Sequence, residues 1–307
     1  MCIIRRLLIV LTIIVCASFI SCVNTTPSGE HTIKASQKIG LVLGGGGAKG
    51  SASIGALKVI EQSGIKIDCI AGTSIGAIIG ALYAAGYSAD EIEDLFATIK
   101  WKDLLKGNRL EAKFEELLLA RNVSSFKDLK IPFRCVAVNV NTGKDEVFAN
   151  GQVCKAIRAS MSIPPIYTPV EFNGNEYVDG GFINNFPVDV VKAMGADFVI
   201  AIDLQQDKEE SFFQRTAEKL NRKHNIDALA TFVGDLFGKE CEFVIEYLKT
   251  RPDTVRYVRN KRNVDIYINP DLTNFNAASF GRNNSRVMFD RGEDAAKKYI
   301  KELRKLK

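Results

Sequence analysis

The stretch of sequence that decides the fold is residues 67–85, IDCIAGTSIGAIIGALYAA. It begins as a short apolar run typical of a buried strand and ends as a helix that is apolar on all sides. Between the two, Ser74 stands at the centre of a Gly-x-Ser-x-Gly pattern that is completed by Gly72 and Gly76. Such a pattern is typical of a tight strand–turn–helix that presents a serine hydroxyl to a substrate. Ser74 is therefore the candidate nucleophile.

A second run of small residues, GGGGAKG, occupies positions 44–50 and follows an apolar run over 39–43. Consecutive glycines leave backbone N–H groups open to a ligand, so the run predicts an oxyanion hole for the charge that develops when a serine attacks an ester. The expected donors and the residues that complete the motif are Gly45, Gly46, Gly47, Lys49 and Gly50. The Lys49 side chain in this motif either neutralises a nearby anion or stabilises the loop itself.

The same glycines also fit the Gly-x-Gly-x-x-Gly pattern of dinucleotide-binding folds. That fingerprint requires an acidic residue at the end of the second strand. Asp68 stands instead at the beginning of that strand, which runs directly into Ser74. A purely structural glycine turn is a third interpretation, and the oxyanion hole is the one that the sequence favours.

The general base is sought among very few groups, because the chain has only two histidines. Asp179 precedes Gly180 and Gly181, a pattern typical of an open turn. His224 follows it in the order of a Ser-Asp-His triad, but it lies in a polar, cationic stretch typical of a surface helix. A Ser74–Asp179 dyad is favoured, and a triad through His224 stays open.

Strands and helices alternate along the chain, which indicates an α/β fold with a mostly parallel central sheet. The strands are expected at 39–43, 67–71, 133–140, 198–203 and 264–268, and the helices at 49–62, 75–85, 207–250 and 291–306, with a further one opened by a capping box at Ser88 and Glu91. This pattern predicts a catalytic core over 38–205 and a mainly helical C-terminal region over 206–307 that packs on it.

The N-terminus has the form of a secretory signal. Arg5 and Arg6 precede an apolar run over 7–20 that is too short to span a bilayer, and small residues follow it. The end of this segment resembles a bacterial lipobox. We therefore expect a signal peptide over 1–21, lipidation at Cys22, and a flexible tether over 22–37.

Composition bounds the function further. A net charge of +5 is too low for the dense basic face of a nucleic-acid protein, and 46% hydrophobic residues are enough for a large core. The basic C-terminal segment is expected to be a solvated helix face, with attraction to anionic lipid as the alternative. Four cysteines lie beyond the signal and the lipidation site, without metal-ligand spacing: Cys69, Cys135, Cys154 and Cys241. We expect buried free thiols for the two in strand-like runs, although a disulfide stays open.

The glycine run at 44–50, the Gly-x-Ser-x-Gly pattern and the Asp-Gly-Gly turn occur in the order and spacing of patatin-like phospholipases. Two further blocks, at 159–164 and 184–188, resemble the same family. The resemblance covers about residues 38–203 and implies a three-layer α/β/α fold, a Ser-Asp dyad, no metal and no cofactor. Two departures from bacterial members are Ser53 in place of histidine and Pro165 in place of glycine.

The resemblance implies hydrolysis of acyl esters in phospholipids or lysophospholipids, with a membrane lipid as substrate. With the expected anchor, it places the protein in a bacterial cell envelope facing the periplasm, at the outer membrane rather than the inner one. A general carboxylesterase or thioesterase for soluble esters is the second enzyme hypothesis. A lipoprotein that binds lipid without catalysis is the third.

Overall fold

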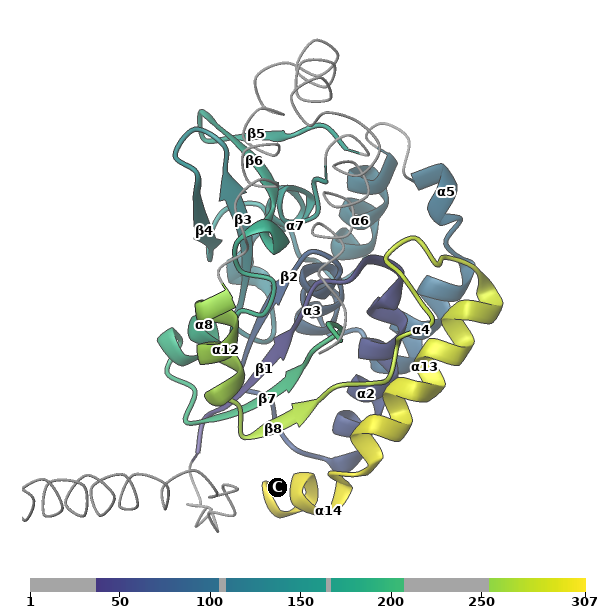
Figure 1. Ribbon diagram of the computed structural model, residues 1–307. Coiled ribbons are helices and arrows are strands. Elements are labelled where there is room, and N and C mark those ends of the chain that lie inside the picture. The colour runs from purple at the N-terminus through teal and green to yellow at the C-terminus, as the bar shows by residue number, and fades with distance from the viewer. Residues whose placement is uncertain (1–36, 105–108, 164–166, 207–253) are drawn as a thin grey trace, which may run out of the picture. The chain divides into compact units, whose positions relative to one another are not determined.

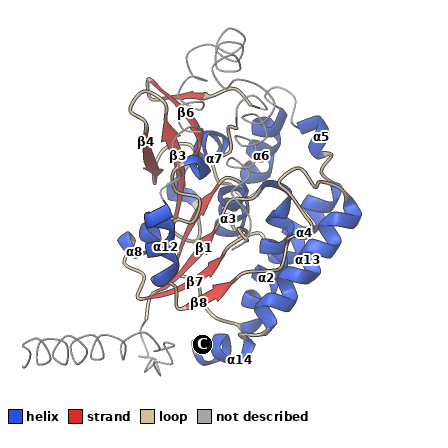
Figure 2. Ribbon diagram, viewed as in Figure 1, coloured by secondary structure: helices blue, strands red, loops and turns tan. Residues whose placement is uncertain are grey.

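A central eight-stranded sheet organises the computed structural model, which describes residues 37–104, 109–163, 167–206 and 254–307 (Figure 1, Figure 2). The strands are β1 (Ile39–Leu43), β2 (Cys69–Thr73), β3 (Phe133–Asn139), β4 (Lys144–Phe148), β5 (Val170–Phe172), β6 (Asn175–Asp179), β7 (Phe198–Ile202) and β8 (Ile266–Ile268). Their order is β5-β6-β3-β2-β1-β7-β8, and β4 pairs with β3 outside this path. The pairs from β3 through β8 along this path are parallel, whereas β4, β5 and β6 join by antiparallel pairing.

Helices cover both faces of the sheet. They are α2 (Gly50–Ser63), α3 (Ile75–Ala85), α4 (Ala89–Thr98), α5 (Trp101–Leu104), α6 (Arg109–Leu119), α7 (Val153–Ser160), α8 (Val188–Ala193), α12 (Thr254–Arg262), α13 (Arg282–Lys297) and α14 (Ile300–Lys305), with short 3₁₀ turns η1 (Gly47–Lys49), η2 (Phe126–Asp128) and η3 (Gly180–Phe182). Along β1, Leu41 and Leu43 join the core on the α2 and α3 face, whereas Val42 joins a separate core with residues of α8. The predicted three-layer α/β/α fold is confirmed.

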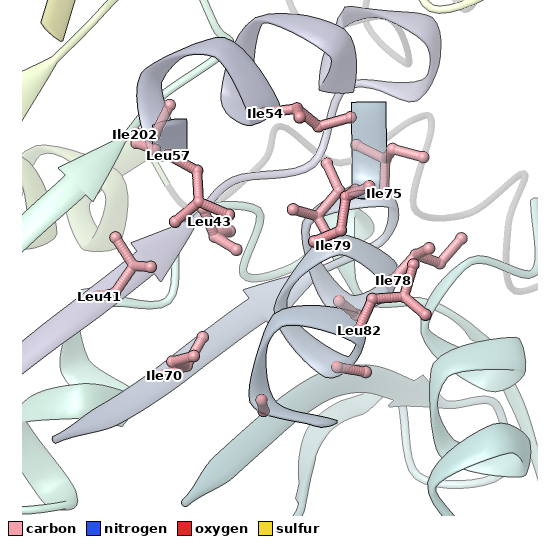
Figure 3. Packing of buried hydrophobic residues seen from close by; sticks show 14 of the residues in the cluster. Leu41, Leu43, Ile54, Leu57, Ile70, Ile75, Ile78, Ile79, Leu82 and Ile202 are labelled. Atoms are coloured by element: carbon pink, nitrogen blue, oxygen red, sulfur yellow. The ribbon is translucent and has the colours of Figure 1, made fainter. Parts of the chain in front are cut away.

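The larger core lies between the sheet and helices α2 and α3. Figure 3 shows the packed side chains, which come from the sheet (Leu41, Leu43, Ile70, Ile202), from α2 (Ile54, Leu57) and from α3 (Ile75, Ile78, Ile79, Leu82). Nearly all of these side chains are fully buried. Each such burial typically contributes about 1.5–3 kcal/mol relative to an exposed side chain. This packing fixes α3 on the sheet and therefore fixes the turn that precedes it.

Helix α3 lies where the sequence predicts it, and the central strands lie within two residues of their predicted ranges. The capping box at Ser88 and Glu91 is present. The second strand begins two residues late, at Cys69, because the Asp68 carboxylate accepts the Ile39 N–H at 2.9 Å beside the sheet. The helix expected over 291–306 is two helices, α13 and α14, separated at Tyr299, whose φ of −103° and ψ of 7° are not helical.

The C-terminal region contributes to the sheet as well as to the helical layers. Strand β8 pairs with β7 in parallel, and α13 packs along α2 (Figure 1). Helix α12 packs on α8 on the opposite face. The helical segment expected over 207–250, the signal peptide over 1–21 and, apart from its last residue, the tether over 22–37 lie outside the described residues. Among the residues described, none of the helices is long and apolar enough to cross a bilayer.

Candidate active site

Ser74 occupies the turn between β2 and α3, as the Gly-x-Ser-x-Gly pattern predicts. Its φ of 57° and ψ of −125° lie in a region that residues with a side chain rarely adopt. The turn is tight because Gly76 packs directly on β1: a Cβ there would stand 2.1 Å from the Leu43 carbonyl oxygen. The strained backbone places the Ser74 hydroxyl at the carboxyl end of the sheet, as in a nucleophile elbow.

Asp179 lies at the end of β6, immediately before η3. Its Oδ2 accepts a hydrogen bond of 2.6 Å from the Ser74 hydroxyl, and its Oδ1 accepts one of 2.7 Å from the Gly181 N–H. Both side chains are buried, with 6% of Ser74 and 1% of Asp179 exposed. The structure therefore brings together the two residues that the sequence singles out, although 105 positions separate them.

Burial controls the charge of the carboxylate. Desolvation raises the pKa of Asp179 to about 7, against the opposing effects of the hydrogen bonds from Ser74 and Gly181. No charged side chain among the described residues contributes to this shift. A carboxylate with a pKa near neutrality is a stronger base than an ordinary aspartate, and it remains ionised in part at pH 7.

The N–H of Ser74 has a partner that motif analysis does not identify. It donates a hydrogen bond of 2.9 Å to Ser160 Oγ, and the Ser160 hydroxyl donates in turn to the Val136 carbonyl at 2.6 Å. Ser160 is fully buried at the end of α7. It belongs to the 159–164 block, whose sequence carries no signal for this contact.

The glycine run forms the loop between β1 and η1, beside the elbow. The Gly44 N–H donates to the Ile202 carbonyl at 3.0 Å, and the Gly45 N–H donates to the Asn185 carbonyl at 3.2 Å. Of the three donors that the sequence predicts for an oxyanion, Gly45 is therefore occupied. The N–H groups of Gly46 and Gly47 have no acceptor within the described part of the chain.

The remaining motif residues support this arrangement. Lys49 is 7% exposed at the end of η1, and Gly50 begins α2 against Ile75. Gly72 lies in β2 against the backbone of Gly76. Gly180 and Gly181 form η3 after the candidate base. The alternative base His224 and the expected lipidation site Cys22 lie outside the described residues.

The cysteines that the structure describes are free and buried: Cys69, Cys135 and Cys154. Burial raises the pKa of all three thiols, and that of Cys154 reaches about 12. This confirms the expectation of buried free thiols for the two strand residues. Cys241 falls in a part of the chain that is not described.

A partly buried polar network lies behind the site and includes helix α12, which the sequence does not connect with it. Asp189 Oδ1 accepts hydrogen bonds of 3.0 Å from Asn184 Nδ2 and Asn260 Nδ2, and its Oδ2 accepts one of 2.6 Å from Arg256 Nη2. Although burial acts to raise it, the hydrogen bond from Arg256 holds the pKa of Asp189 below its ordinary value. The Asn184 carbonyl accepts the Thr73 hydroxyl at 2.9 Å, so this network reaches the residue before Ser74.

Known proteins share both the sequence pattern and the fold. Residues 41–192 match the model of the family described as patatin-like phospholipase. The chain is 30% identical over 272 residues to patatin-like phospholipase domain-containing protein 7 of Rattus norvegicus, which covers 80% of this chain and 19% of the relative. It is 34% identical over 195 residues to lysophospholipase NTE1 of Phaeosphaeria nodorum, which covers 57% of this chain and 13% of the relative.

The chain thus spans less than a fifth of the length of these two curated relatives. Among solved structures, VipD from Legionella pneumophila has the same fold, with a TM-score of 0.56 at 15% identity over 87% of this chain and 67% of that one. The family match ends at α8, shortly after the turn that carries Asp179. The motif order, the fold and the relatives agree, and over residues 41–192 the chain belongs to the patatin-like phospholipase family.

Proposed function

We propose that the protein is a lipid acyl hydrolase that cleaves carboxylic esters of phospholipids or lysophospholipids and releases fatty acid. The observation that carries this proposal is the 2.6 Å hydrogen bond from the Ser74 hydroxyl to a buried carboxylate, made at a strained strand–turn–helix. A serine hydroxyl is a weak nucleophile unless a base within hydrogen-bond reach removes its proton. Asp179 supplies that base.

The reaction proceeds in two halves. Asp179 accepts the hydroxyl proton as Ser74 Oγ attacks the ester carbonyl, and the proton then passes to the leaving alcohol or lysophospholipid. Asp179 next accepts a proton from a water molecule that attacks the acyl-enzyme, and the fatty acid leaves as Ser74 recovers its proton. The oxyanion of both tetrahedral intermediates is held by the N–H groups of Gly46 and Gly47, which have no other acceptor in the described residues.

A lipid substrate is supported by the family and by the names of the relatives, which include lysophospholipase NTE1. We further propose that Cys22 carries a lipid and holds the enzyme at a bacterial envelope membrane, on the periplasmic side, where its substrates lie. The features that support this are the sequence patterns at Arg5, Arg6 and Cys22. Membrane anchoring would raise the local concentration of a bilayer substrate.

The proposal is tested with the full chain in mild detergent, by measuring the fatty acid that it releases from added substrates. Phosphatidylcholine and lysophosphatidylcholine are offered beside a soluble p-nitrophenyl butyrate and a long-chain acyl-CoA. The proposal expects release from one or both lipids in preference to the soluble compounds. Preference for the butyrate or the acyl-CoA supports the carboxylesterase or thioesterase alternative. Absence of any turnover, with no labelling of Ser74 by a fluorophosphonate, supports a lipid-binding protein without catalysis.

A further inference from the structure

Asn185 holds the glycine loop by two hydrogen bonds to one residue. Its backbone carbonyl accepts the Gly45 N–H at 3.2 Å, and its side-chain Nδ2 donates to the Gly45 carbonyl at 3.2 Å. Both polar groups of Gly45 are thereby paired with the same residue. A pair of contacts of this kind fixes the orientation of a peptide as well as its position, because rotation about either bond breaks the other.

The Asn185 carboxamide also lies close to both residues of the candidate dyad. A Cβ built on Gly45 would stand 2.2 Å from Asn185 Oδ1 and 3.1 Å from Ser74 Cβ. A Cβ built on Gly181 would stand 2.7 Å from the same Oδ1 and 2.9 Å from Asp179 Oδ1. The carboxamide therefore fills the space left by two glycines, one beside the nucleophile and the other beside the base.

The residue that makes these contacts is itself firmly placed. Asn184, which precedes it, donates its N–H to the Gly180 carbonyl at 2.9 Å and accepts the Thr73 hydroxyl through its own carbonyl. Its side chain is held by Asp189. The loop that carries Asn185 is thus hydrogen-bonded to the strand before Ser74 and to the turn after Asp179. The two hydrogen bonds from Asn185 to Gly45 therefore fix the glycine loop relative to both.

From these contacts we infer that Asn185 is a positioning residue, which fixes Gly45 so that the N–H groups of Gly46 and Gly47 are held beside Ser74 during catalysis. This inference rests on the proposed function, because it assigns those N–H groups to the oxyanion. An oxyanion hole depends on donors that are placed in advance of the reaction. Gly45 itself contributes no donor, since its N–H is already bound to Asn185.

The test compares Asn185→Ala with wild type as full chains, with p-nitrophenyl butyrate as the substrate and a fluorophosphonate as an active-site titrant. Removal of the side chain deletes the bond to the Gly45 carbonyl and leaves the backbone bond in place. We expect all sites to be titrated, an unchanged KM, and a kcat per titrated site that falls about 10- to 100-fold, which is somewhat less than the loss of a whole oxyanion donor. The matched control is Asn263→Ala, an exposed asparagine on the solvent side, for which kcat stays at the wild-type value.

A second variant, Asn185→Asp, tests the placement by charge. A carboxylate at this position faces the Gly45 carbonyl without a donor and stands close to Asp179, so it disfavours a second negative charge there. We expect the acidic limb of the kcat–pH profile to move to higher pH by about one pH unit, in addition to the loss of kcat. A side chain at position 185 that lay away from Asp179 would leave this limb in place.

Three outcomes overturn the inference. The first is a kcat per titrated site for Asn185→Ala within about threefold of wild type, even if fewer sites are titrated, because that pattern describes a fold contact alone. The second is an Asn185→Asp profile with an unmoved acidic limb. In both cases the wild type is active and the proposed function stands. A wild-type protein that neither turns over the ester nor reacts with the titrant overturns the proposed function and this inference together.

Discussion

Thr73 and Asp179 pair with consecutive residues of the same strand. Thr73, the last residue of β2, lies opposite Val136 of β3, and Asp179, the last residue of β6, lies opposite Ala137. Strand β4 pairs with residues 135–139 and therefore occupies one edge of β3. Strands β2 and β6 must both pair with the opposite edge. Strands β2 and β6 thus approach each other end to end along one edge. Because the carboxyl ends of the two strands meet, Ser74, which follows Thr73, lies next to Asp179.

The pH dependence of catalysis should follow the charge of Asp179. The base must be ionised to accept the Ser74 proton, and its pKa in the folded protein is about 7. We therefore expect kcat/KM for a neutral ester to rise as the pH rises through about 7 and to level above it. A profile measured from pH 5 to 9 checks this. A flat profile above pH 5 would show that the working base has an ordinary carboxylate pKa.

The free energy of unfolding should fall over the pH range in which the activity rises. The pKa of Asp179 is raised on folding, so between an unfolded value of about 3.9 and the folded value of about 7 the native state holds a proton that the unfolded chain does not. The native state is therefore destabilised as the pH rises through this window, and the full cost is present above pH 7. Asp179→Asn keeps the shape of the side chain and does not titrate.

We expect Asp179→Asn to exceed the wild type in free energy of unfolding at pH 8, by a margin on the order of 3–4 kcal/mol. The margin should shrink as the pH is lowered to 5. Urea unfolding of both proteins at several pH values measures it. A margin that is independent of pH would mean that burial does not raise the pKa of Asp179.

Backbone strain at Ser74 predicts a difference between two inactive variants. Ser74→Ala removes the hydroxyl but keeps a Cβ at a φ of 57°. Ser74→Gly removes both, and glycine adopts positive φ without steric cost. Strain of this kind is typically 1–3 kcal/mol, partly offset by the entropy that glycine loses on folding, so Ser74→Gly should be the more stable variant by about 1 kcal/mol. Equal unfolding midpoints would contradict the strained turn.

Close packing at Gly76 predicts that the elbow does not accept a methyl group. Ala at this position would place a Cβ 2.1 Å from the Leu43 carbonyl, so β1 and α3 would have to separate. Gly174 is a suitable comparison, because a Cβ there meets nothing within 4 Å and only its φ of 76° opposes alanine. We expect Gly174→Ala to cost about 1 kcal/mol with full activity, and Gly76→Ala to cost several times more and to lose activity. Thermal unfolding and ester turnover measure both.

Much of the site could be predicted because its residues lie in local patterns with a known physical purpose. Ser74 belongs to a strand–turn–helix signature, and the glycine loop follows an apolar strand. The buried parallel strands are continuous apolar runs, which are readily recognised. The turn at Asp179 and the scarcity of histidine favour this residue as the base, and the structure places it in contact with Ser74.

The parts that could not be predicted depend on contacts between distant segments. Strand β4 has the sequence KDEVF and is largely solvent-facing, so it lacks the apolar alternation of a strand. The first turns of α13, RNNSRV, are also largely solvent-facing and lack an apolar stripe, so the sequence pattern predicts a helix that begins nine residues later. No local pattern reveals that Ser160 accepts the Ser74 N–H or that the Asn185 side chain donates to the Gly45 carbonyl. The contact of Asn260, from the C-terminal region, with Asn184 is equally hidden.

In the proposed mechanism Ser74 is activated by Asp179 and not by a histidine. The most direct test is fatty-acid release from lysophosphatidylcholine by the full chain and by three variants, Ser74→Ala, Asp179→Asn and His224→Gln, with circular dichroism as the check on folding. We expect the first two variants to lose at least about 10³-fold in kcat and His224→Gln to retain wild-type turnover. Loss of turnover in folded His224→Gln, or retention of it in Asp179→Asn, would contradict the dyad.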